Sequence, residues 1–163
     1  MNKPLPKELT SQQLKALKAT LATILEDVSV IEKVIGPLLL EANRTKSVPV
    51  IIFCHDVLQS LRLIPIYARN ILKILPEPGT SPNPIEEGVT VLLQGFLGVT
   101  KESLIRPRPN YGQTENLFNI MSEFCNLKEY PELGVSAQIA KINIRAVKLH
   151  HLAISLRQIL DLD

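Results

Sequence analysis

The side chains best suited to chemistry gather in the last quarter of the sequence, in a segment whose apolar spacing predicts a helix. Within it, Lys141, Arg145 and Lys148 recur at i, i+4 and i+7, so a helix places them on one face. Such a basic strip could contact phosphates or an acidic protein surface. A solvated face of an otherwise apolar helix is the alternative. No aromatic residue lies between these cations, which disfavours stacking of single-stranded bases.

Arg145 and His150 also form the pattern R-x4-H. This pattern resembles the Arg/His motif of HEPN-type helical ribonucleases, in which both side chains act on the RNA backbone near a dimer interface. The resemblance covers these two residues, and Ala146 stands where the family often has a polar residue. It implies catalytic roles for Arg145 and His150. The other interpretation of His150 is a hydrogen-bonded histidine in the core.

A second candidate for recognition is the loop at residues 106–111, in which Arg106 and Arg108 are each followed by a proline and Tyr111 comes last. Prolines stiffen such a loop toward the polyproline II conformation, and arginine and tyrosine are enriched at interface hot spots. These three residues are therefore predicted to bind a partner. A rigid connector between helices is the alternative.

Metal, cofactor and nucleophile motifs are missing from the sequence. Cys54, His55 and Asp56 are good ligand types, but consecutive residues of a helix project about 100° apart and cannot converge on one ion. Cys54 is expected to be a core thiol with His55 and Asp56 turned toward solvent, and Cys125 is also expected to pack. No phosphate-binding glycine motif is present. We expect neither a metal site nor a cofactor, and an enzymatic role is the less favoured one.

Composition points to one intracellular domain. The chain has 163 residues, of which 45% are hydrophobic and 4% aromatic, with a formal net charge of +2. The chain is therefore long enough and apolar enough to form a core, which is mainly aliphatic. Its net charge is too small to create a strong electrostatic field. Two cysteines do not make a disulfide framework. No signal peptide or membrane span is evident, so a cytoplasmic protein without a membrane partner is expected.

Residues 11–40 carry the clearest structural pattern. Apolar residues alternate steps of three and four, which predicts a helix with one buried stripe: Leu14, Leu17, Leu21, Ile24, Val28, Ile31, Ile35 and Leu38. Charged residues, Asp27 among them, are expected to fall away from the centre of this stripe. Thr10 or Ser11 can cap the helix, and a kink or restart is predicted at Pro37. The stripe suits an intramolecular core better than a two-chain coiled coil.

Further helices are predicted over residues 47–75 with a bend at Pro65, from Pro84 onward with Asn83 as its cap, over 114–125 and over 131–160. The run at 48–53 could alternatively be a buried strand. Residues 76–84 and 106–112 are predicted loops. The last helix has apolar residues almost all the way round, which suggests a central position or a covering subunit.

The sequence therefore predicts an all-α, single-domain bundle of roughly four to six helices with Pro-kinked long helices, spanning 1–163 with residues 1–9 as a flexible arm. The favoured function is a non-enzymatic interaction module, an adaptor, assembly or regulatory subunit that binds another protein or a second copy of itself. The alternative is an RNA-binding or HEPN-like ribonuclease domain that uses the basic and histidine residues of the last helix.

Overall fold

The fold is all-α, as predicted. The computed structural model describes residues 3–79, 82–105, 116–126 and 133–162. The helices in chain order are α1 (Ser11–Thr45), α2 (Val48–Leu61), α3 (Leu63–Ile74), α4 (Glu87–Thr100), α5 (Leu117–Asn126) and α6 (Leu133–Ile159), and a π-helical turn η1 (Lys101–Ile105) continues α4. Two short strands, β1 (Glu8–Leu9) and β2 (Asn83–Pro84), pair antiparallel beside the bundle.

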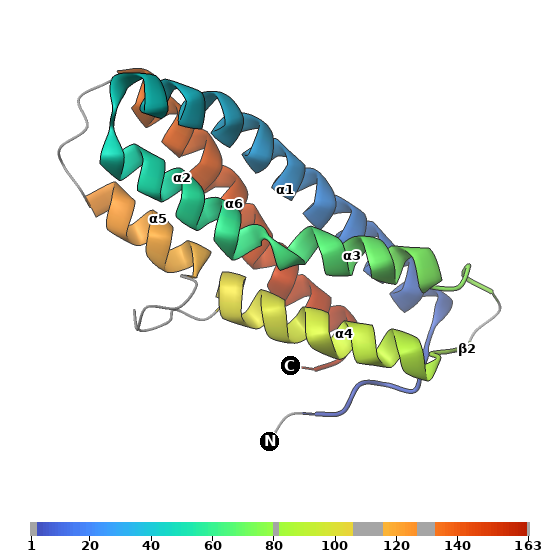
Figure 1. Ribbon diagram of the computed structural model, residues 1–163. Coiled ribbons are helices and arrows are strands. Elements are labelled where there is room, and N and C mark those ends of the chain that lie inside the picture. Colours follow the sequence, from blue (N-terminus) through green and yellow to red (C-terminus); the bar gives the residue numbers. More distant parts are fainter. Residues whose placement is uncertain (1–2, 80–81, 106–115, 127–132, 163) are drawn as a thin grey trace.

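The first helix, α1, is the central helix of the bundle and packs on α2, α3 and α6. All eight residues of its predicted apolar stripe are buried, which confirms the heptad pattern as an intramolecular core. Helix α1 lies along α6 over much of its length and also packs on α2 and α3 (Figure 1). Its N-terminus carries a capping box, in which the Thr10 hydroxyl accepts from the Gln13 amide and the Gln13 side chain accepts from the Thr10 amide.

The prediction at Pro37 was a kink or a restart. Helix α1 continues through this residue, which excludes the restart, and the kink stays a prediction. Pro37 is exposed and so is Lys33, whose carbonyl loses its helical partner because proline has no amide hydrogen. That carbonyl can be hydrated, and the proline ring needs no space in the core. The helix ends two turns later at Thr45.

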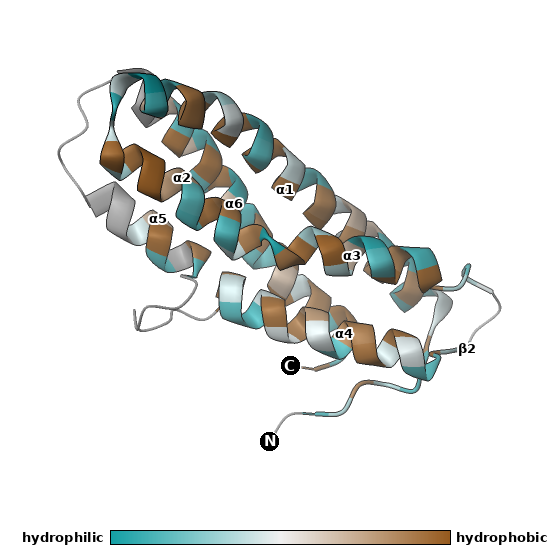
Figure 2. Cartoon of the chain, in the orientation of Figure 1, coloured by the Kyte–Doolittle hydropathy of each residue, from teal (hydrophilic) through white to brown (hydrophobic). Residues whose placement is uncertain are grey.

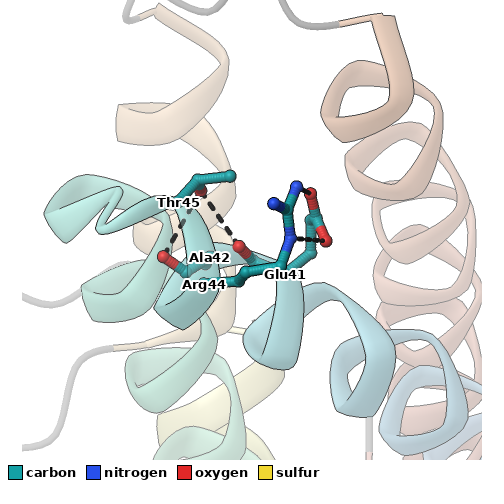
Figure 3. Close-up of polar contacts among 4 residues, drawn as sticks. All are labelled: Glu41, Ala42, Arg44 and Thr45. Carbon is teal, nitrogen blue, oxygen red and sulfur yellow. Dashed lines mark hydrogen bonds and ion pairs between the residues drawn. The ribbon is translucent and has the colours of Figure 1, made fainter.

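Local side-chain contacts finish the last turn of α1 (Figure 3). The Thr45 hydroxyl donates to the carbonyls of Glu41 and Ala42, at 3.0 and 3.4 Å. The Arg44 guanidinium holds the Glu41 carboxylate through two hydrogen bonds, and this contact lowers the pKa of Glu41. Lys46 then adopts the left-handed conformation, with φ of 57°, that commonly ends a helix.

The predicted 47–75 helix is divided at Arg62 into α2 and α3, which run in different directions (Figure 1). The break lies at the residue after Leu61, whose carbonyl would bond the amide that Pro65 lacks. The alternative of a strand at 48–53 is excluded. By length and composition the segment Val48–Ile74 could cross a membrane, which the sequence interpretation did not anticipate, although a core helix of a globular protein meets the same criterion.

Helix α4 begins at Glu87 rather than at Pro84, so Asn83 is not its cap. Asn83 instead belongs to β2 and is buried, where its side-chain amide donates to the Leu9 carbonyl and its oxygen accepts from the Gly79 amide. Leu9 itself is buried in the core. The last residues of the expected N-terminal arm are therefore part of the fold.

Candidate functional site

The basic strip of α6 meets an acidic residue of α1. Asp27 lies off the centre of the apolar stripe, as expected, but it is fully buried. Its Oδ1 accepts a hydrogen bond from Arg145 Nη1 at 2.9 Å and lies 3.4 Å from Lys148 Nζ. Its Oδ2 is buried without a hydrogen-bond partner among the residues that the structure describes. A buried carboxylate requires such partners because desolvation of a lone charge is costly.

The predicted strip is therefore divided between two environments. Arg145 and Lys148 neutralise Asp27 while parts of both side chains stay in solvent. Lys141 is exposed. Two of the three cations thus have an intramolecular role that is sufficient to explain them, and their predicted contact with a partner stays a prediction.

His150 has a separate partner on another side of α6. Its Nδ1 lies 2.8 Å from the carbonyl oxygen of Leu104 in η1. A carbonyl can only accept, so Nδ1 carries the hydrogen and Nε2 of the neutral ring is left as an acceptor. The structure thus ties Arg145 to α1 and His150 to η1, and does not bring them together on one described group.

An apolar pocket lies beside His150, between α5 and α6. Its volume is about 370 Å³. Leu104, Leu117, Met121 and Ala146 are its buried residues, and Ser122, Asn143, Val147 and His150 complete the lining. We refer to it as the α5–α6 pocket. Pockets of this size and character are where small ligands bind in proteins.

A second surface feature lies along α2 and α3. Five large aliphatic side chains of these helices are exposed, and we call them, with the exposed cations beside them, the α2–α3 outer face: Val48, Ile52, Leu63, Ile66, Ile74, Arg62, Arg69 and Lys73. Apolar segments alternate with hydrophilic ones along both helices (Figure 2). The opposite sides of the same helices supply core residues such as Phe53 and Ile64.

The charge on this face has one sign. Asp56 is the single acidic residue between 48 and 75, and it is half-buried rather than exposed. Burial raises the pKa of Asp56, against the opposing influence of His55. The exposed charges of α2 and α3 are consequently positive, and the face combines aliphatic and cationic side chains.

The remaining predicted residues divide into two groups. Arg106, Arg108 and Tyr111 lie outside the described residues. Cys54 is buried, as predicted, and burial raises its pKa to about 11. Within the described ranges no group of three or more potential metal ligands is close enough to hold an ion.

Comparison with known proteins gives no assignment: no family model, no curated protein and no solved structure matches this chain. The arguments about function therefore depend on the chain's own residues.

Sequence reasoning missed both the pocket and the outer face. The sequence interpretation did not consider the apolar residues of this segment that lie off its buried side. A helical projection that continues from Val48 to Ile74 would have placed Val48, Ile52 and Ile66 opposite the buried side. The pocket gives no such signal, because it forms between residues far apart in the sequence.

Proposed function

We propose that this protein is a non-enzymatic interaction module whose α2–α3 outer face binds an acidic, partly apolar surface of another protein. The observation that carries the proposal is the exposure of Val48, Ile52 and Ile66, at 59, 53 and 49%, on two helices that together span 27 residues. Soluble proteins rarely leave a long row of large aliphatic side chains in water, and such rows mark interaction surfaces. At 1.5 Å per residue, α2 with its 14 residues is about 21 Å long and α3 with its 12 residues is about 18 Å long.

Charge selects the type of partner. Arg62, Arg69 and Lys73 are exposed beside the aliphatic row, and no exposed acid on these helices offsets them. Complementary charge speeds encounter and suppresses wrong partners, while the aliphatic row supplies most of the affinity. An amphipathic helix with carboxylates at the edges of its apolar face fits both requirements.

The test is capture of partners from the source cell with immobilised protein, compared across matched variants. Ile52→Asn with Ile66→Asn removes the apolar contact, and Arg62→Glu with Arg69→Glu reverses the charge. Leu40→Asn with Val91→Asn is the control, since both residues are exposed aliphatics on other helices. We expect an acidic partner that the wild type and the control retain and that both α2–α3 variants lose.

Two results would overturn the proposal. One is a set of captured proteins that is identical for all four forms. The other is loss of the captured proteins after nuclease treatment, which would mean that nucleic acid mediates the binding. Sedimentation of the purified protein separates a second copy of this chain from a different partner, because a homodimer on this face would dissociate in the Ile52→Asn, Ile66→Asn variant.

A further inference from the structure

We propose that the α5–α6 pocket binds a small, uncharged and mainly apolar molecule that carries one hydrogen-bond donor. The inference is independent of the proposed function, because the pocket is formed by α5, α6 and η1 and not by the α2–α3 outer face.

The size of the pocket sets the size of the ligand. A dry apolar cavity of about 150 Å³ takes up benzene. The α5–α6 pocket measures about 370 Å³, so it has room for a molecule of about two fused rings. Its buried lining consists of Leu104, Leu117, Met121 and Ala146, which would contact such a molecule by dispersion and exclude water.

The described residues of the lining offer no counter-charge to a charged ligand. Among the described residues that line the pocket there is no Lys, Arg, Asp or Glu. An ion transferred into these surroundings would lose its hydration without gaining a counter-charge, at a cost of several kcal/mol. A neutral molecule has no such cost.

His150 is one of three described polar residues in the lining, with Ser122 and Asn143, and its ring is oriented by a hydrogen bond to η1. Its Nδ1 lies 2.8 Å from the Leu104 carbonyl, which can only accept, so in the neutral form of the ring Nε2 is the acceptor. Two residues before Leu104, the Glu102 carbonyl of η1 accepts a hydrogen bond from the side-chain amide of Asn116 at 2.5 Å. A ligand hydroxyl or N–H is therefore the group that the imidazole favours.

The probes are 2-naphthol and 2-methylnaphthalene, which have nearly the same shape and differ in the hydroxyl. Each is titrated into the full ¹⁵N-labelled chain at neutral pH, and amide shifts are followed. We expect both probes to shift the amides of Leu104, Met121 and Ala146. We expect 2-naphthol to bind about fivefold more tightly than 2-methylnaphthalene, because its hydroxyl adds one neutral hydrogen bond.

Variants locate the site and its polar contact. Ala146→Met fills the pocket and should weaken the binding of both probes at least tenfold. Ala140→Met, at an exposed position of the same helix, should leave their binding unchanged. Val147→Phe narrows the pocket from its half-exposed rim and gives the same test if Ala146→Met does not fold. His150→Phe should abolish the preference for naphthol while 2-methylnaphthalene still binds.

If Ala146→Met and Val147→Phe both bind the two probes as the wild type does, the proposal that the α5–α6 pocket is the binding site is wrong. A fivefold preference that persists in His150→Phe would overturn the role of the hydrogen-bond donor. Since neither probe contacts the α2–α3 outer face, these outcomes leave the partner-capture experiment unaffected.

Discussion

The carboxylate of Asp27 accepts a hydrogen bond from the guanidinium of Arg145, across 118 positions of sequence and a contact distance of 2.9 Å. This bond joins α1 to α6, the pair of helices with the most extensive contact in the bundle. Because Asp27 is fully buried, an alignment of the two helices that moved Arg145 away would leave a charge unpaired in the core. The pair therefore favours one alignment over others that the aliphatic residues alone would tolerate.

Breaking this pair should destabilise the protein. Arg145→Ala is expected to lower the free energy of unfolding by about 2 kcal/mol. That is less than for a fully buried pair, because a third of the Arg145 side chain is exposed and Lys148 remains near Asp27. Urea denaturation measures the loss, and Lys141→Ala is the control on the same helix. An Arg145→Ala variant as stable as wild type would contradict the interpretation.

The two partners should respond unequally. Asp27→Asn removes the buried charge and frees Arg145, which can turn to water, so its cost is expected to be smaller than that of Arg145→Ala. The double variant measures the coupling between the two sites. A coupling energy near zero would mean that the hydrogen bond has no net effect on stability.

Helix α4 offers a test of close packing at Gly95. A Cβ at this position would lie 2.7 Å from Cε1 of Tyr67, so Gly95→Ala forces α3 and α4 apart or displaces the ring. We expect a destabilisation of about 1 kcal/mol in place of the gain of about 1 kcal/mol that alanine normally brings to a helix. Gly98→Ala is the matched control, since nothing lies within 4 Å of its added Cβ. Equal effects of the two substitutions would exclude the packing explanation.

Cys54 predicts a dependence of stability on alkaline pH. Burial raises its pKa to about 11, from 9.0, so the folded state holds the thiol proton more tightly than the unfolded state. Unfolding then releases a proton between these values, and the free energy of unfolding should fall by up to about 1.4 kcal/mol per pH unit there. Subtracting the pH profile of Cys54→Ala isolates this contribution. Two parallel profiles from pH 8 to 10.5 would contradict it.

The same burial predicts low reactivity. In a Cys125→Ser background, Cys54 should react with a disulfide reagent at pH 8 only after denaturant is added, because both access and the thiolate are suppressed. Rapid reaction of the native protein would show that α2 opens readily.

Substitution of Asn83 tests the hydrogen bonds that this side chain makes beside β1 and β2, in place of the predicted helix cap. Asn83→Ala removes the hydrogen bonds to Leu9, Ser11 and Gly79 and should cost about 2 kcal/mol. Asn70→Ala, at an exposed position on α3, should be nearly neutral. Amide hydrogen exchange should also increase at Ile85, whose amide bonds the Lys7 carbonyl. Unchanged protection at Ile85 would mean that β1 and β2 pair without the side chain of Asn83.

Local pattern was enough to predict most of the helices. The three-and-four spacing from Leu14 to Leu38 determines a buried stripe, the Thr10 hydroxyl and Gln13 determine where α1 begins, and Pro65 determines that the 47–75 helix is interrupted. These features depend on side chains within one or two turns of each other. These features can therefore be predicted from the sequence without knowledge of the tertiary structure.

Tertiary structure decided the features that depend on distant residues. Asp27 lies at the flank of its stripe, where the spacing fits either burial or exposure, and the cations of α6 determine which is stable. Asn83 could cap a helix or join two strands, and the proximity of Leu9 and Gly79 selected the strands. His150 acquired its tautomer from Leu104, and the α5–α6 pocket formed where three elements meet. The burial of a charge, the tautomer of a ring and the shape of a cavity are set by neighbours in space, and the sequence pattern does not record which neighbours those are.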